Sequence, residues 1–93
     1  MWAEKLINIS KIDEQVFEVT LTKKTTTIHR VKLSTKVYKS LSDSKISEIE
    51  LIKKSFEFLL ERESNESILR EFNLETIETY FPEYPLFIKK NFN

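Results

Sequence analysis

The sequence predicts an α+β domain, in which an N-terminal antiparallel β-hairpin packs against three or four helices. Residues 16–22 and 26–33 alternate apolar and polar side chains, which is the two-residue period of a strand. From residue 35 onward, apolar side chains recur at the spacing of a helix. Because 93 residues is the length of one domain, we expect residues 1–93 to form a single unit.

The predicted hairpin has one apolar face and one polar face. Its first strand places three apolar side chains together, Phe17, Val19 and Leu21. Its second strand places His29 on the same face as Val31 and Leu33, with the basic side chains on the opposite face. Residues 5–12 are rich in Ile and would add a third strand if they join the sheet.

Serine residues mark the starts of two predicted helices. Ser34 is an N-cap for a short helix over 35–41. A long helix is predicted over about 46–63, and the capping-box spacing of Ser47 and Glu50 gives Ser47 as an alternative start. The pattern then predicts helices over 66–72 and 74–80, followed by an extended tail over 81–88.

The apolar faces of these elements define a predicted core. We expect these side chains to be buried: Phe17, Val19, Leu21, Val31, Leu33, Val37, Leu41, Ile49, Ile52, Phe56, Leu59, Leu60, Ile68, Leu69, Phe72 and Ile77.

Composition argues against an enzyme. The chain has no Cys, no Gly and a single His, so thiolate chemistry, glycine-rich phosphate loops and multi-histidine metal sites are excluded within one chain. We expect His29 to be a packed strand residue rather than a catalytic base. We therefore predict a non-catalytic protein without a cofactor. There is no apolar run of membrane-spanning length and no signal-peptide pattern, so a cytoplasmic location is expected.

The net charge of zero conceals an uneven distribution. Residues 20–45 contain seven Lys or Arg and one Asp, whereas residues 46–83 contain ten Glu and four Lys or Arg. The basic segment could attract an anion such as duplex DNA. The candidate contacts are Lys23, Lys24, Arg30, Lys32 and Lys36. The alternative is that both segments form ordinary solvated faces.

The order strand, cap, short helix, turn and longer helix over residues 27–63 resembles the ribbon-helix-helix DNA-binding proteins. The resemblance implies a homodimer in which this strand pairs with its copy from a second chain and enters the major groove. The outward side chains Ile28, Arg30 and Lys32 would then contact bases. The helix start at Ser47 would contact a phosphate.

A second resemblance involves the strings SFEFLLERE (55–63), SILR (67–70) and YFPEY (80–84). These strings are similar to those of a group of short uncharacterised bacterial proteins. This resemblance implies no activity and no site residue.

Aromatic side chains near the C-terminus allow two interpretations. The side chains are Tyr80, Phe81, Tyr84 and Phe87. They could lie across the helices and complete the core. They could instead form an exposed patch that binds a protein partner or a second copy, which would make the chain a protein–protein interaction module.

Overall fold

Three antiparallel strands and one short parallel strand form a mixed sheet. The structure, a computed structural model, describes residues 6–43 and 45–90. The first three strands, β1 (Leu6–Asp13), β2 (Val16–Thr22) and β3 (Thr26–Lys32), form an antiparallel meander. The fourth strand, β4 (Glu71–Asn73), pairs in parallel with β3, so the strand order is β1-β2-β3-β4. The predicted α+β fold and its N-terminal hairpin are therefore confirmed.

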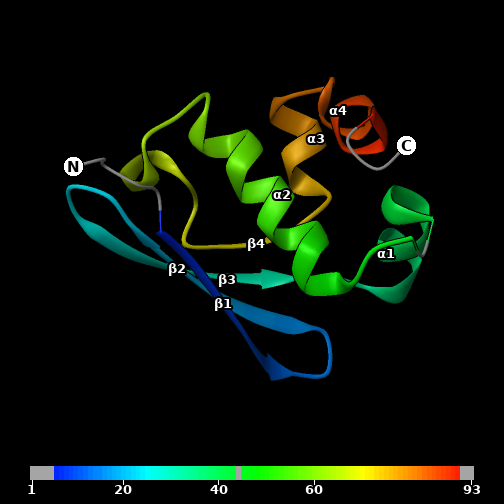
Figure 1. The fold of residues 1–93 in the computed structure, drawn as a ribbon, viewed down its shortest axis with the longest axis horizontal. Coiled ribbons are helices and arrows are strands. Elements are labelled where there is room, and N and C mark those ends of the chain that lie inside the picture. Colours follow the sequence, from blue (N-terminus) through cyan, green and yellow to red (C-terminus); the bar gives the residue numbers. More distant parts are fainter. Residues whose placement is uncertain (1–5, 44, 91–93) are drawn as a thin grey trace.

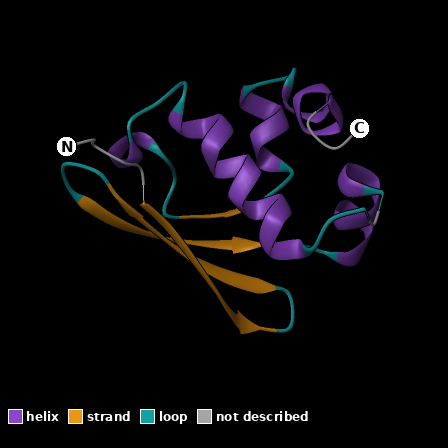
Figure 2. Cartoon of the chain, in the orientation of Figure 1, coloured by secondary structure: helices purple, strands orange, loops and turns teal. Residues whose placement is uncertain are grey.

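The helices lie together on one face of this sheet (Figure 2). They are α1 (Thr35–Ser42), α2 (Glu48–Leu60), α3 (Thr76–Tyr80) and α4 (Tyr84–Lys90), with a 3₁₀ turn at Asn65–Ser67. The long helix α2 crosses over the sheet, with α1 beside its lower end in the view and α3 and α4 to its upper right (Figure 1). The opposite face of the sheet, here called the outer face, carries the exposed side chains of β3.

Both predicted serine caps are present. The Ser34 hydroxyl accepts a hydrogen bond from the Val37 N–H at 3.2 Å, and the Ser47 hydroxyl accepts one from the Glu50 N–H at 3.1 Å. At the other end of α1, Asp43 takes the left-handed conformation with φ 56°. A left-handed residue at the end of a helix is most often glycine, but the chain has none, and Asp43 adopts this conformation instead.

The predicted helix over 66–72 is wrong. This stretch contains the end of the 3₁₀ turn and the start of β4. The open edge of β3 determines the outcome, because the Arg30 N–H donates to the Arg70 carbonyl at 2.7 Å and the Leu74 N–H donates to the Lys32 carbonyl at 3.0 Å. Pairing with β3 therefore satisfies the backbone groups that a helix would have satisfied internally.

The predicted extended tail is also wrong, since residues 84–90 form helix α4. Pro85 is the second residue of that helix, where a missing N–H removes no helical hydrogen bond. Tyr84 is fully buried, and its hydroxyl is hydrogen-bonded to the Ser55 hydroxyl on α2.

Most of the predicted core is buried, with two clear exceptions. Ile49 and Leu69 are 40% and 48% exposed, because Ile49 lies outside the buried face of α2 and Leu69 lies next to the short edge strand. The list of predicted core residues also left out several side chains that are buried: Leu51, Phe58, Leu74, Tyr84 and Ile88. Phe58 is buried because the C-terminal segment covers the side of α2 on which its ring lies.

Candidate functional site

The basic side chains predicted to contact DNA do not gather in one patch. Lys23 and Lys24 lie in the turn between β2 and β3, whereas Lys32 is the last residue of β3 and Lys36 lies on α1. A strand rises about 3.3 Å per residue, so the turn and Lys32 are roughly 20 Å apart. The structure therefore divides the predicted contacts between the two ends of β3.

Arg30 lies at the middle of the outer face, between two acidic residues. The strand register places Glu18 of β2 on one side of Arg30 and Glu71 of β4 on the other. All three side chains point to the outer face, because paired positions share a face. Two flanking carboxylates lower the positive potential that Arg30 could offer to a phosphate or a base.

In this sheet, neighbouring strands of the same chain take up much of the pairing capacity of β3. β3 pairs with β2 along its whole length, and β4 occupies its other edge at Arg30, Val31 and Lys32. A strand from a second chain has no free edge there. This pairing weighs against the ribbon expected from the ribbon-helix-helix resemblance, and DNA binding and a homodimer stay predictions.

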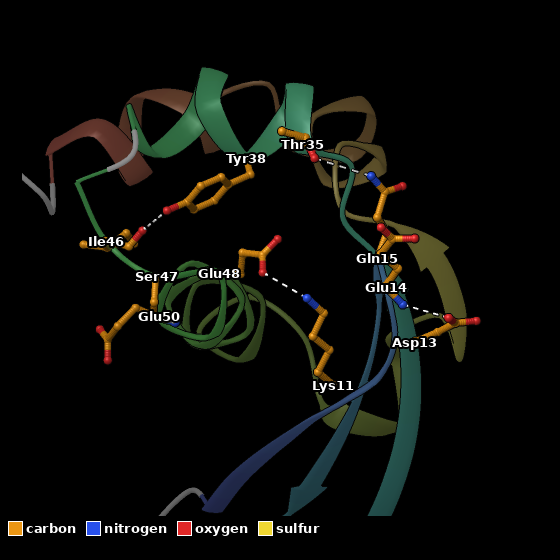
Figure 3. A network of polar contacts seen from close by, with 10 residues as sticks. All are labelled: Lys11, Asp13, Glu14, Gln15, Thr35, Tyr38, Ile46, Ser47, Glu48 and Glu50. Atoms are coloured by element: carbon orange, nitrogen blue, oxygen red, sulfur yellow. Dashed lines mark hydrogen bonds and ion pairs between the residues drawn. The ribbon is translucent and has the colours of Figure 1, made fainter.

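At Ser47, the predicted phosphate anchor, neighbouring side chains contact other groups of the chain (Figure 3). The Ser47 hydroxyl caps the Glu50 N–H, and Glu48 pairs with Lys11 at 3.5 Å. Nearby, the Tyr38 hydroxyl donates to the Ile46 carbonyl. The carboxylates of Glu48 and Glu50, in the first turn of α2, already interact favourably with the positive end of the helix dipole. They would also repel a phosphate at this end of the helix.

The four C-terminal aromatic side chains have different environments. Tyr84 belongs to the core, and Phe81 and Phe87 are half-buried against Phe58, with ring centroids 5.8 and 4.9 Å from its own. Tyr80 is 64% exposed. The interpretation that this segment completes the core therefore holds for three of the four, and only Tyr80 offers most of its surface to a partner.

An apolar pocket lies beside Tyr80. It has a volume of about 160 Å³ and is formed by the C-terminal end of α2, residues 67–72 and α3. Its apolar walls come from Leu59, Ile68, Leu69, Phe72, Ile77 and Phe81. Glu63 and Tyr80 also line it. Exposed apolar side chains beside a small pocket are typical of a protein-binding surface.

We call Leu69, Glu71, Phe72, Asn73 and Tyr80 the β4 surface. Leu69, Phe72 and Tyr80 line the apolar pocket, and Glu71 and Asn73 belong to the edge strand β4. Of these five, the sequence prediction singled out only Tyr80 as a site residue. β4 has only three residues, so its sequence shows too little alternation to predict a strand. Leu69 was predicted to be in the core because its spacing fits the apolar face of a helix.

His29 is part of a buried polar chain rather than a reactive group. Its Nδ1 lies 2.7 Å from the Leu69 carbonyl oxygen, so this nitrogen carries the proton and donates. Its Nε2 accepts from the Thr27 hydroxyl at 2.8 Å, and Asn65 donates to that hydroxyl at 3.1 Å. Burial lowers the pKa of His29, which keeps the ring neutral.

Residues 6–43 and 45–90 contain no group of three or more His, Cys, Asp or Glu side chains arranged to hold a metal ion. No helix in this part of the chain is both long and apolar enough to cross a membrane. Comparisons of the chain with protein-family models, with curated proteins and with solved structures found no match.

Proposed function

We propose that the protein is a non-catalytic protein-binding module and that its partner docks on the β4 surface. One observation carries the proposal. The edge strand lies beside an apolar pocket whose rim holds two large exposed side chains, Leu69 at 48% and Tyr80 at 64% exposure. Full burial of a fully exposed large apolar side chain is worth about 1.5–3 kcal/mol, so each of these partly exposed side chains would contribute less than that to binding.

A peptide-display selection tests this proposal. A library of random twelve-residue peptides is selected on the wild-type protein, and binders are compared on the double variant Leu69→Ser with Tyr80→Ser. Both side chains are substantially exposed, so the variant should keep the fold. We expect at least a tenfold loss of affinity, which corresponds to about 1.4 kcal/mol.

Leu86→Ser is the matched control. Leu86 is 70% exposed on α4 and does not line the apolar pocket. It should leave the affinity of the selected peptides unchanged. If the double variant and the control retain the same affinity as the wild type, partners do not use the β4 surface.

Duplex DNA is the alternative ligand. The basic composition of residues 20–45 supports DNA binding. The separation of these basic side chains along β3 weighs against it, because they do not form one patch. A titration of fluorescent duplex DNA at two salt concentrations tests it, since phosphate contacts would make the affinity fall steeply with salt. Submicromolar, salt-dependent binding that is lost on Arg30→Glu with Lys32→Glu would favour DNA over a protein partner.

A further inference from the structure

The backbone of β4 has one edge available for another strand. Along a parallel strand, successive residues direct their N–H and C=O groups alternately to the two neighbouring positions. Arg70 and Leu74 bond to β3, so the alternation directs the backbone groups of Glu71 and Asn73 away from β3. In the part of the chain that the structure describes, no strand pairs with that edge.

Two hollows lie on either side of this edge. The apolar pocket lies on the helix side, and a second, open hollow lies toward the outer face, where it is lined in part by Arg30, Lys32 and Glu71. Leu69, Phe72 and Thr76 line both. A strand added here would direct alternate side chains into the two hollows, which is how strand-addition complexes gain specificity.

Charge indicates which side chains fit. Across the outer face, the register gives the row Glu18, Arg30, Glu71, in which the signs alternate from strand to strand. A basic side chain on the added strand, opposite Glu71, would continue this alternation. The neighbouring pair of facing residues is Lys32 and Asn73, so a polar side chain on the added strand fits opposite Asn73. Residues 61–83, which surround the site, contain seven Glu and two Arg, so a cationic segment is also favoured at longer range.

We infer that the partner contributes an extended segment that adds to β4 as a fifth strand. A basic side chain lies opposite Glu71, a polar one lies opposite Asn73, and the apolar side chain between them enters the pocket lined by Phe72 and Leu69. This inference rests on the proposed function and specifies the form and chemistry of the partner.

A pair of synthetic peptides tests the inference. The probe is the acetylated and amidated peptide Ser-Lys-Leu-Thr-Leu-Lys-Ser, which presents the same order of side chains in either strand direction. The comparison peptide replaces both Lys by Glu. We expect the Lys peptide to bind at least ten times more tightly in an NMR titration. We also expect it to slow hydrogen exchange of the Glu71 and Asn73 amides.

The variant Glu71→Lys sharpens the test. It should reverse the preference, so that the Glu peptide binds more tightly than the Lys peptide. Glu14→Lys, an exposed charge change in the turn between β1 and β2, should leave the preference unchanged. If the peptide adds antiparallel to β4, an N-methyl group on the backbone of the central Thr should weaken its binding, because the Thr opposite Asn73 then donates its N–H to β4. If the peptide adds parallel, the N-methyl group should weaken binding when it is placed on one of the two Leu residues instead.

Several results would overturn the inference. They are failure of the Lys peptide to bind, binding without protection of the Glu71 and Asn73 amides, or an unchanged preference in Glu71→Lys. If display-selected peptides lose affinity in the Leu69 and Tyr80 variant but leave those amides unprotected, the proposed function stands and the added strand does not. A dimer mass in light scattering that Glu71→Lys abolishes would assign the edge to a second copy instead.

Discussion

Two sets of contacts attach the C-terminal third of the chain to the rest of the fold. One set consists of hydrogen bonds between buried polar groups, and the other consists of packed aromatic rings. Near β3, a polar chain runs from Asn65 through Thr27 to His29 and ends at the Leu69 carbonyl. Near α2, the attachment is aromatic, since Tyr84 packs against Phe58 with ring centroids 5.3 Å apart. The first attachment positions the segment that leads into β4, and the second positions α4.

The difference shows what each attachment depends on. The polar chain depends on every donor finding its acceptor, so one lost partner leaves a buried group unpaired. The aromatic attachment depends mainly on buried area and close packing, with one hydroxyl contact between Tyr84 and Ser55. Burial raises the pKa of Tyr84, so that the hydroxyl stays protonated at neutral pH. Of the two attachments, only the polar chain contains a histidine, His29.

The largest expected effect comes from removal of the Tyr84 ring. Tyr84→Ala should lower the free energy of unfolding by about 3–5 kcal/mol, because it leaves a cavity beside Phe58. Tyr84→Phe keeps the ring and should cost about 1 kcal/mol for the lost hydroxyl contact. Urea denaturation measures both. Equal costs for the two variants would show that the hydroxyl, rather than the packing, fixes α4.

Asn65→Ala should have the next largest effect. Asn65 is buried and donates to the Thr25 carbonyl as well as to the Thr27 hydroxyl, both at 3.1 Å. Loss of both hydrogen bonds should cost about 1–3 kcal/mol in urea denaturation. Glu66→Ala, at an exposed neighbour, should cost much less. A cost for Asn65→Ala no greater than for this control would contradict a structural role for the polar chain.

Acid should weaken the polar attachment selectively. The pKa of His29 lies below its ordinary value of 6.5 in the folded chain, mainly because of burial. The unfolded chain therefore takes up a proton first as the pH falls below about 6.5, which favours unfolding. His29 contributes this stability fully above that pH and loses it as the pH falls through the folded pKa.

The urea midpoint at pH 7.5 and at pH 5.5 measures this effect. We expect a lower midpoint at pH 5.5 for the wild type and a smaller difference for His29→Gln, which cannot titrate. The Arg70 charge also lowers the pKa of His29, after the larger effect of burial. The same pH dependence in both proteins would show that another group is responsible.

The smallest expected effect lies outside both attachments. Asp43 has a positive φ angle, which glycine adopts without steric cost. Asp43→Gly should raise the free energy of unfolding by up to about 1 kcal/mol in a thermal melt. It should leave the pH dependence unchanged, because the substitution is at the end of α1. A destabilised variant would indicate that the Asp43 side chain makes a contact of greater value.

Local pattern was sufficient to predict the N-terminal half of the fold. The alternation in β2 and β3 and the caps at Ser34 and Ser47 depend on neighbours in the sequence, and the structure has all four. β4 could not be predicted in this way. Its three residues are extended because β3 offers an edge to them, and that edge is created only by the tertiary fold.

The same limit applies to the candidate site. Net charge over residues 20–45 predicted a basic patch, but the structure places these side chains at opposite ends of β3 and sets Arg30 between two carboxylates. The prediction treated Leu69 as a core residue, yet it lies exposed beside the edge strand. Spacing along a chain does not reveal which elements become neighbours.

The parallel pairing of β3 with β4 also bears on the order of folding. The meander β1-β2-β3 forms from contacts that are close in sequence, whereas β4 reaches β3 only after residues 33–70 have crossed over the sheet. The last strand to join covers the edge of β3 at Arg30, Val31 and Lys32. Until it joins, that edge is open to pairing between unfinished chains. Once it has joined, the short strand is expected to keep this part of the β3 edge from pairing with other chains.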